Sequence, residues 1–308
     1  PRAVKAFWAR VASGTWDAVI VPHSQFDRLS VSLERRMRYL REEVDAYMDA
    51  IEGAAEGSAT VKKLERARSS ASRRLKKLSE EKSDGLSTFE DTGCDFLFVD
   101  ESHAYKNLAV PSSMAFGGLS STPSMRASAC LDKCKVLREE GHGGNIVFAT
   151  GTPVSNSMAE LYALSRYLAP GMLRQTGNDN FAFWAKNFAS VTVQTELKPE
   201  GTGFRQVRRF SKFNNLPELM QTVHSFMDVK TAAELDLDVP ECEVATVAVE
   251  PSESQRELMQ EFSDRADLVR SGAVDPSADN LLKITSDLRK CALDPRLLAP
   301  DDEDVVPL

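Results

Sequence analysis

Three short runs of apolar residues, each ending in polar residues, organise the first half of the chain, at residues 18–21, 96–99 and 145–150. Each run has the length of a buried strand, and the segments between them carry helical patterns. Short apolar strands separated by helices are typical of a buried parallel sheet in an α/β fold. In such sheets ligands bind at the carboxyl ends of the strands, so we expect a site where the second and third runs end.

Apolar residues recur at three- and four-residue steps over residues 31–52 and again over residues 60–82, with a glycine-containing break between the two stretches. Two antiparallel helices joined by such a turn form a helical hairpin, which we place at about residues 30–83 as an insertion between two strands. The patterns also predict a β-hairpin across residues 198–202 and a strand at residues 241–251. Further helices are expected at residues 124–140, from a Ser157–Glu160 capping box to residue 169, and at residues 181–188, 215–236, 252–271 and 277–293.

Composition narrows the class of protein. The chain has 308 residues, of which 42% are apolar and 27% are charged, as in ordinary soluble globular proteins. Its apolar runs are far too short to span a bilayer, and its five cysteines are too few and too scattered for a disulfide scaffold. We therefore expect a cytoplasmic protein with no membrane partner. Cys130 and Cys134 share a helix face, but no second pair or histidine completes a metal site there.

Charge is distributed unevenly along the chain. The formal net charge of −8 argues against non-specific nucleic-acid binding by the chain as a whole. Residues 61–82, however, hold nine Lys or Arg and only three Glu. This basic helix face is either simply solvated or a surface for DNA phosphates. In the second case the candidate residues are Lys62, Lys63, Arg66, Arg73, Arg74, Lys76 and Lys77.

The sequence FLFVDESHAYKN, residues 96–107, joins an apolar run directly to two carboxylates. Charge is costly to bury, so Asp100 and Glu101 either mark the solvated end of a strand or hold something positive. An Asp-Glu pair after an apolar strand is also the Walker B arrangement. There the first carboxylate holds Mg²⁺, and the second orients and deprotonates the attacking water.

The surroundings of this pair carry a resemblance to a known family. The sequence VDESHAYKN, residues 99–107, resembles motif II of the Swi/Snf-type superfamily-two helicases, and IVFATGTPVSNSMAELYALSRYLAPG, residues 146–171, resembles their motif III region. Residues 247–262 and 281–298 are similar to the family's link into its second motor lobe and to a helix beyond it. Together with residues 9–29 and 211–220, these segments look like the large helicase–adenine-DNA-methylase proteins of phages, plasmids and conjugative elements.

The resemblance implies a fold, a cofactor and roles for matching residues. Residues 1–176 would form a partial first RecA-like motor lobe, residues 177–240 an extension of helices and a β-hairpin, and residues 241–308 a linker and the start of a second lobe. ATP and Mg²⁺ would be the cofactors. The implied catalytic residues are Asp100, which would hold Mg²⁺, Glu101, which would polarise the water, and His103, which would link the nucleotide site to motif III.

Further roles implied by the resemblance concern coupling and DNA. Thr150, Gly151 and Thr152 would relay the nucleotide state to the DNA side, although threonines also cap such turns. The segment with His23, Ser24 and Gln25 occupies the place of a DNA-contacting loop, or is simply a turn with Ser24 as its cap. The implied partners are double-stranded DNA and further parts of the same polypeptide, in a bacterial or phage-encoded protein.

A phosphate-binding loop is the main feature that the sequence lacks. Such loops end in Gly-Lys-Ser/Thr, and none of the sixteen glycines here is followed by lysine. We therefore expect an internal piece of an ATPase motor that neither binds ATP tightly nor hydrolyses it alone. The alternatives are a non-catalytic module that docks DNA or a partner domain, and an unrelated α/β hydrolase that uses Asp100 and Glu101 on a metal.

Overall fold

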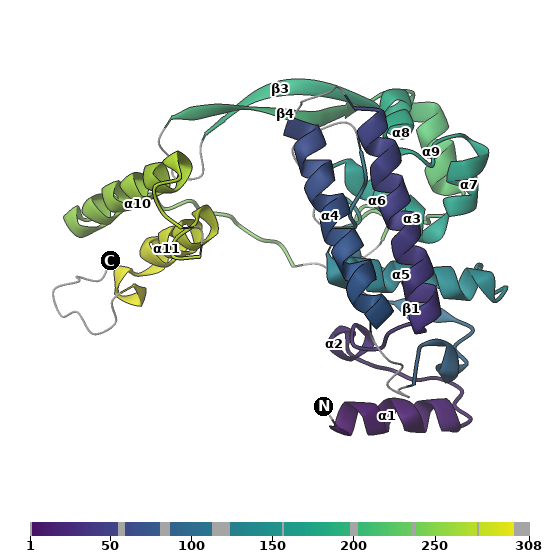
Figure 1. Cartoon of the computed structure of the whole chain (residues 1–308). Coiled ribbons are helices and arrows are strands. Elements are labelled where there is room, and N and C mark those ends of the chain that lie inside the picture. Colours follow the sequence, from purple (N-terminus) through teal and green to yellow (C-terminus); the bar gives the residue numbers. More distant parts are fainter. Residues whose placement is uncertain are drawn as a thin grey trace. The chain divides into compact units, whose positions relative to one another are not determined.

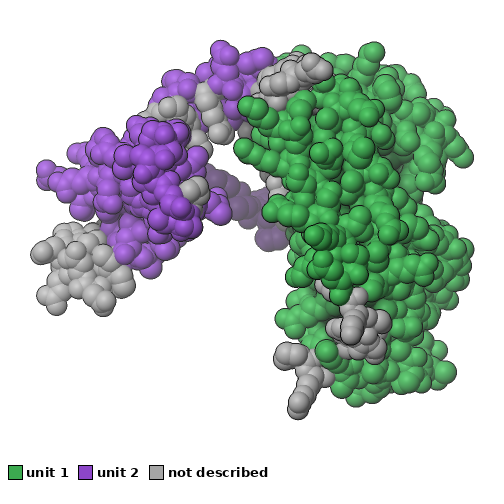
Figure 2. Space-filling model, in the orientation of Figure 1, with its two compact units in different colours: residues 1–192, 208–228 green, residues 193–207, 229–308 purple. Residues whose placement is uncertain are grey.

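The computed structural model describes residues 2–54, 59–80, 87–112, 124–155, 157–197, 203–235, 238, 240–275 and 277–298. Residue contacts divide the chain into two compact units, shown in different colours in Figure 2. One unit comprises residues 1–192 and 208–228, and the other comprises residues 193–207 and 229–308. All the residues that the sequence singles out as candidate site residues belong to the first unit.

Two parallel strands form the sheet at the centre of the first unit, β1 (Leu97–Val99) and β2 (Ile146–Phe148). They pair in register, from Leu97 opposite Ile146 to Val99 opposite Phe148. Alternation along β1 buries Leu97 and Val99 and leaves Phe98 61% exposed. The structure thus confirms an α/β fold and the parallel arrangement of the second and third apolar runs.

The strand predicted at residues 18–21 does not form. Residues 18–22 belong to no helix or strand, and the Ile20 side chain is 97% exposed, whereas Val21 packs against the core. An extended segment becomes a strand only when a neighbouring backbone pairs with it. Among the residues that the structure describes, β1 and β2 pair only with each other, so no strand lies beside this segment.

Helices pack around the two strands. The core of this region contains Trp8 of α1 (Arg2–Ser13), Phe26 of α2 (His23–Phe26), Leu137 of α5 (Met125–Glu139) and Tyr167 of α6 (Ala159–Leu168). α5 connects β1 to β2, as a parallel pair requires, and matches the helix predicted at residues 124–140. Two short 3₁₀ helices, η1 (Glu90–Thr92) and η2 (Ser102–Tyr105), flank β1 in the sequence.

A second hydrophobic cluster of the first unit lies beyond α6. It is rich in aromatic rings, among them Tyr162, Phe181, Trp184 and Phe210. The segments that follow α6 are α7 (Pro170–Gln175), α8 (Phe181–Phe188), β3 (Ala189–Leu197), β4 (Phe204–Phe213) and α9 (Leu216–His224). β3 and β4 pair with each other, which confirms the predicted β-hairpin. The helix predicted at residues 215–236 is shorter than expected, because it ends at His224.

Two long helices, α3 (Leu33–Glu52) and α4 (Ala59–Glu80), lie side by side and form the predicted helical hairpin (Figure 1). Each is amphipathic, and their apolar stripes face each other. The resulting small core is separate from that of the strands, and its buried members are Leu40, Tyr47, Ala50, Leu64, Ala71 and Leu78. The hairpin therefore has its own packing, although Tyr39 of α3 is buried in the core around the strands. The base of the hairpin also has a polar attachment to the rest of the unit.

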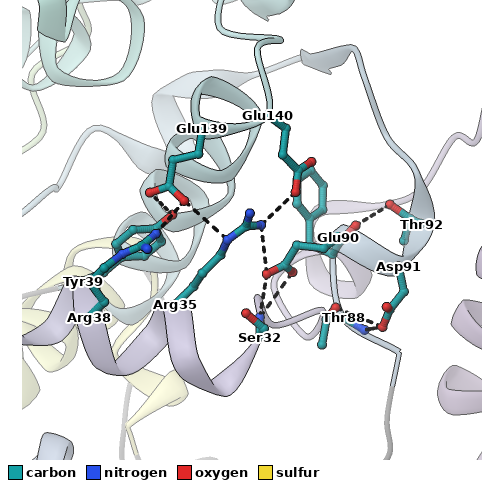
Figure 3. A network of polar contacts seen from close by, with 11 residues as sticks. Ser32, Arg35, Arg38, Tyr39, Thr88, Glu90, Asp91, Thr92, Glu139 and Glu140 are labelled. Atoms are coloured by element: carbon teal, nitrogen blue, oxygen red, sulfur yellow. Dashed lines mark hydrogen bonds and ion pairs between the residues drawn. The ribbon is translucent and has the colours of Figure 1, made fainter.

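A cluster of charged side chains provides this attachment (Figure 3). The Arg35 guanidinium of α3 lies 3.2 Å from the Glu90 carboxylate of η1, 3.3 Å from Glu139 and 2.9 Å from Glu140, at the end of α5. The Glu90 carboxylate also accepts a hydrogen bond from the Ser32 backbone N–H, 3.0 Å away. Three carboxylates thus share one arginine that is only 22% exposed.

We predict that Arg35→Met lowers the free energy of unfolding at neutral pH by about 1–3 kcal/mol, because it removes the arginine that Glu90 and Glu140 face, whereas Glu139 keeps its ion pair with Arg38. Burial alone would raise the pKa of Glu90, but the hydrogen bonds from Ser32 and the charge of Arg35 outweigh it, so this pKa lies below its ordinary value of 4.5. A lowered carboxyl pKa stabilises the fold above 4.5, and that stabilisation is lost as the pH falls through the lowered value.

Urea unfolding, followed by circular dichroism, measures the effect. The deficit of Arg35→Met should therefore shrink in acid. Arg41→Met is the matched control, because Arg41 is exposed on the same helix, and it should change the free energy of unfolding by no more than about 0.5 kcal/mol. Equal changes in the free energy of unfolding for the two substitutions would contradict an attachment of the hairpin through Arg35.

The second unit contains α10 (Glu253–Ser271), α11 (Leu281–Leu293) and the 3₁₀ helix η3 (Pro295–Leu297). α10 and α11 pack through Phe262, Ala266 and Ile284, and α10 begins with a capping box formed by Ser252 and Gln255. These helices confirm the predicted mainly helical C-terminal part. The strand predicted at residues 241–251 is wrong, because this segment is extended without pairing among the described residues and Val244 is 88% exposed.

Candidate functional site

The ends of β1 and β2 lie next to each other, because the hydrogen-bond ladder continues beyond both strands. The Ala149 N–H donates to the Val99 carbonyl over 2.8 Å, and the Ser102 N–H donates to the Ala149 carbonyl over 2.9 Å. These bonds tie the segment after β1 to the segment after β2. The two polar motifs of the sequence, around Asp100 and Thr150, therefore meet at one edge of the sheet.

The turn from Asp100 to Glu101 has an unusual backbone. Glu101 lies in the left-handed region, with φ 47° and ψ 44°, which costs a residue with a side chain about 1 kcal/mol or more. Both atoms of the peptide group between Asp100 and Glu101 are hydrogen-bonded. Its N–H donates to the Asp100 Oδ1 over 2.9 Å, and its carbonyl accepts from the His23 Nε2 over 2.9 Å.

His103 connects the two motifs. Its Nδ1 lies 3.0 Å from the Glu101 Oε2 and 3.5 Å from the Thr150 Oγ1. The shorter distance, to a carboxylate that can only accept, indicates that Nδ1 carries a hydrogen and donates it to Glu101. The Thr150 Oγ1 in turn accepts a hydrogen bond from the Thr152 N–H over 3.1 Å, and Gly151 between them is exposed.

The structure therefore brings most of the predicted nucleotide-site residues into one group. Asp100, Glu101 and His103 lie beside Thr150 and Thr152, and His23 joins them from α2 through the Asp100 carbonyl. The carboxylates of Asp100 and Glu101 are exposed, and the Glu101 side chain is 65% exposed. Exposure avoids the cost of burying charge, so this end of a buried strand tolerates two adjacent carboxylates.

One ion pair of the site carries no predicted role. The Lys106 Nζ lies 3.4 Å from the Glu160 Oε1, with both side chains largely buried, and also contacts the Ser155 hydroxyl. Glu160 accepts a hydrogen bond from the Ser155 N–H over 2.7 Å, and the Ser157 Oγ accepts from the Ala159 N–H over 3.2 Å. The N-cap of α6 is Met158, so Ser157 does not cap this helix as predicted. The sequence feature that could have indicated this ion pair is Lys106, which lies three residues after His103 in the first motif.

Tyr105, the last residue of η2, follows the turn at Asp100 and Glu101 and is fully buried. Its hydroxyl donates to the Asp27 Oδ1 over 3.0 Å, and Arg126 lies over its ring and 2.7 Å from the Asp27 Oδ2. Burial and the hydrogen bond to Asp27 raise the pKa of Tyr105, so the hydroxyl remains a donor. The Tyr167 hydroxyl is 3.1 Å from the Tyr105 carbonyl, which fixes η2 from the side of α6.

The basic residues of the hairpin form a separate group on α4. Arg74 is half-buried and lies 3.7 Å from Glu43, whereas Lys62, Arg66 and Arg73 line a shallow hollow with Glu65 and Ser69. The fully exposed basic candidates are Lys62, Lys63, Arg66, Arg73, Lys76 and Lys77. The expected DNA-contacting loop is instead helical: His23, Ser24 and Gln25 form α2, whose N-cap is Pro22 rather than Ser24. Ser24 is exposed, and the ring of His23 packs on Tyr105 with ring centres 5.2 Å apart. The buried Gln25 Oε1 has no hydrogen-bond partner among the described residues.

Asp100 has the chemistry for a Mg²⁺ ion that is shared with a phosphate. In the described part of the chain, no group of three or more His, Cys, Asp or Glu side chains is placed to hold a metal. An exposed carboxylate with one oxygen bonded to a backbone N–H still fits Mg²⁺, which typically takes one or two carboxylates and completes its shell with water and substrate phosphates. The geometry does not support a metal held entirely by protein side chains there.

Comparisons with known proteins identify the family of the chain. A family described as a probable helicase domain matches residues 1–231, so the chain belongs to that family. The chain is also 24% identical over 267 residues to the "Defense against restriction protein B" of Escherichia phage P1, an alignment that covers 80% of this chain and 12% of that protein. No solved structure matches. None of the helices that the structure describes is long and apolar enough to cross a membrane.

The left-handed backbone of Glu101 gives a test that needs no ligand. We predict that Glu101→Gly is more stable than Glu101→Ala by about 1 kcal/mol, because both remove the carboxylate but only glycine adopts a positive φ without strain. Urea unfolding measures the difference. At Glu65, exposed on α4, the order should reverse, with glycine less stable than alanine by about 1 kcal/mol. If alanine equals glycine at position 101, the turn is not strained.

Proposed function

We propose that this chain is a part of a DNA-dependent ATPase motor of the Swi/Snf type, with a RecA-like lobe built around β1 and β2. The observation that carries the proposal is the meeting of two strand ends at one edge of the sheet, which places Asp100 and Glu101 beside Thr150 and Thr152. Membership of a probable helicase domain family supports the same class of function. In the complete protein the activity would be translocation on double-stranded DNA.

The residues of the site suit distinct steps of ATP hydrolysis. Bound ATP with Mg²⁺ supplies the phosphoanhydride bond that is cleaved. Asp100 would hold Mg²⁺, and the exposed carboxylate of Glu101 would accept the proton of the attacking water and orient it. His103 donates to the Glu101 Oε2, which fixes the direction of that carboxylate. Thr150, in contact with His103, would pass changes at the nucleotide to the second motif.

A phosphate-binding loop and an arginine-bearing second lobe would have to come from further parts of the same polypeptide. Such elements stabilise the transferred phosphoryl group, and removing them costs orders of magnitude in rate. The phage P1 protein that the chain resembles is much longer than the aligned region, and its name refers to defence against restriction. We propose that this chain belongs to a comparably large protein of a mobile element, possessing a DNA methylase domain and acting in the bacterial cytoplasm.

ATP hydrolysis tests the proposal directly. In the complete polypeptide, Glu101→Gln should lower DNA-stimulated ATP turnover by about 10²–10⁴-fold, the usual contribution of a general base, while DNA affinity is unchanged. Release of phosphate at saturating ATP measures turnover. The 308-residue chain alone should show no hydrolysis above its own Glu101→Gln variant. Turnover that survives the substitution in the complete polypeptide would contradict the role of Glu101.

The second candidate function is a non-catalytic module that docks DNA, and the observation that favours it is the exposed basic face of α4. Six of the seven basic candidates there are exposed, which suits contact with phosphates but also suits simple solvation. The two functions are compatible, because α4 and the strand-end site are different surfaces of one unit. DNA binding by this chain without hydrolysis would support the docking function alone.

We predict that replacing Lys62, Arg66 and Arg73 together by alanine weakens binding of this chain to duplex DNA about tenfold and flattens its salt dependence. Fluorescence anisotropy at several salt concentrations measures both. The matched control replaces Lys5, Arg41 and Lys186, which are exposed on other helices, and so makes the same change in net charge. Equal losses in the two triple variants would show that α4 is only a solvated face.

A further inference from the structure

Among the residues that the structure describes, the side chain of His23 holds the peptide group between Asp100 and Glu101 from outside its own turn. The Asp100 Oδ1 that accepts from the N–H of this peptide belongs to the turn itself and can move with it. The His23 Nε2 that donates to the carbonyl over 2.9 Å belongs to α2, seventy-seven residues earlier in the chain. Because a carbonyl oxygen can only accept, the His23 Nε2 must carry a hydrogen.

His23 is itself fixed by its surroundings. Its ring packs on the fully buried Tyr105, and Tyr105 is hydrogen-bonded to Asp27, one turn after His23. Arg126 of α5 closes this arrangement by its ion pair with Asp27, 2.7 Å away. The donor on His23 is therefore presented by a packed unit of three elements, α2, η2 and α5, rather than by a free surface side chain.

The backbone strain at Glu101 favours rotation of the peptide, and the hydrogen bond from His23 opposes that rotation. Rotating a peptide group by a half turn changes the ψ of the residue before it and the φ of the residue after it, with little movement of the rest of the chain. Such a rotation would take the φ of Glu101 from 47° into the extended region, where its strain is relieved. It would also withdraw the Asp100 carbonyl from His23 and turn both carboxylates to new directions.

We propose that His23 is a positioning residue that keeps the Asp100–Glu101 peptide in its strained orientation and thereby aims the two carboxylates. This role differs from the DNA contact that the sequence pattern suggests for His23, and it leaves the exposed Ser24 as a candidate for DNA. The holding of the peptide follows from the geometry alone. Its effect on turnover rests on the proposed ATPase function, so the experiment has two separate arms.

The first arm uses the 308-residue chain and needs no ligand. The difference in urea midpoint between Glu101→Gly and Glu101→Ala reports the left-handed strain at position 101. This difference should be present with His23 and with His23→Gln, whose amide nitrogen replaces Nε2 as a donor. It should be lost with His23→Phe, which keeps a ring against Tyr105 but has no donor, because the peptide is then free to rotate.

His23→Asn provides a second variant if His23→Phe does not fold. Its amide is too short to reach the Asp100 carbonyl, so it should also abolish the difference between glycine and alanine. Ser24→Ala is the matched control on the same short helix and should leave the difference intact. An undiminished difference in His23→Phe or His23→Asn would overturn the proposal, because the strain would then not depend on His23.

The second arm uses the complete polypeptide with ATP and duplex DNA. His23→Phe should lower ATP turnover by about tenfold or more, as expected when catalytic groups are misdirected, and leave DNA affinity within about twofold of the parent. His23→Gln should restore turnover. Loss of DNA affinity in both variants would instead identify His23 as a DNA contact and overturn the proposal. A parent protein that hydrolyses no ATP would refute the proposed function, while the first arm would still decide whether His23 holds the peptide.

Discussion

The parallel pairing of β1 with β2 is the interaction on which the site depends. A parallel ladder places the carboxyl ends of both strands at the same edge, and here the bonds of Ala149 and Ser102 continue that ladder into the following turns. Without this register Glu101 and Thr150, which lie in different motifs of the sequence, would not both contact His103. A slip of one residue would also exchange the buried Leu97 and Val99 with the exposed Phe98, so burial of the core selects the register that assembles the site.

Some charged side chains of the first unit are exposed to solvent, and others are largely buried in ion pairs. The side chains of Asp100 and Glu101 remain in contact with solvent, which avoids a large desolvation cost and leaves them available for a ligand. Lys106 with Glu160, and Arg35 with Glu90, are instead removed from much of the solvent and paired. Pairs of this second kind fix how segments join, because breaking one leaves an uncompensated charge. A buried apolar run can therefore end in two carboxylates, because the side chains of Asp100 and Glu101 lie outside the buried region.

The sequence predicted the elements whose signal is local. Amphipathic periodicity identified α3 and α4 to within a few residues, the helices α5 and α10 were predicted equally closely, and the apolar runs identified β1 and β2. It failed for residues 18–21 and 241–251, where the apolar pattern of a strand was present but pairing was not. Pairing depends on a second backbone, so a strand pattern by itself is an incomplete prediction.

For the candidate site, the sequence predicted the chemical groups but not the contacts between them. Asp100, Glu101, His103 and Thr150 came from motif resemblance, and the structure adds that His103 bridges Glu101 and Thr150. The bond from His23 to the Asp100 carbonyl could not be predicted, because it joins a side chain to a backbone atom that any residue possesses. The left-handed conformation of Glu101 was equally hidden, since glutamate carries no preference for positive φ.

α5 connects the two surfaces to which functions are assigned. Its carboxyl end carries Glu139 and Glu140, which hold the base of the helical hairpin, and its amino end carries Arg126, which supports Tyr105 beneath the carboxylates. A helix of 15 residues spans about 22 Å and is stiff over that distance. Continuity of packing alone does not amount to coupling, because coupling needs an element with two discrete arrangements. If His23 has the proposed role, the peptide between Asp100 and Glu101 would be such an element: its observed orientation is strained and hydrogen-bonded to His23, and the rotated orientation would lose both the strain and that bond. A signal from α4 would therefore have to act at α2 and η2, where the side chain that holds this peptide is itself positioned.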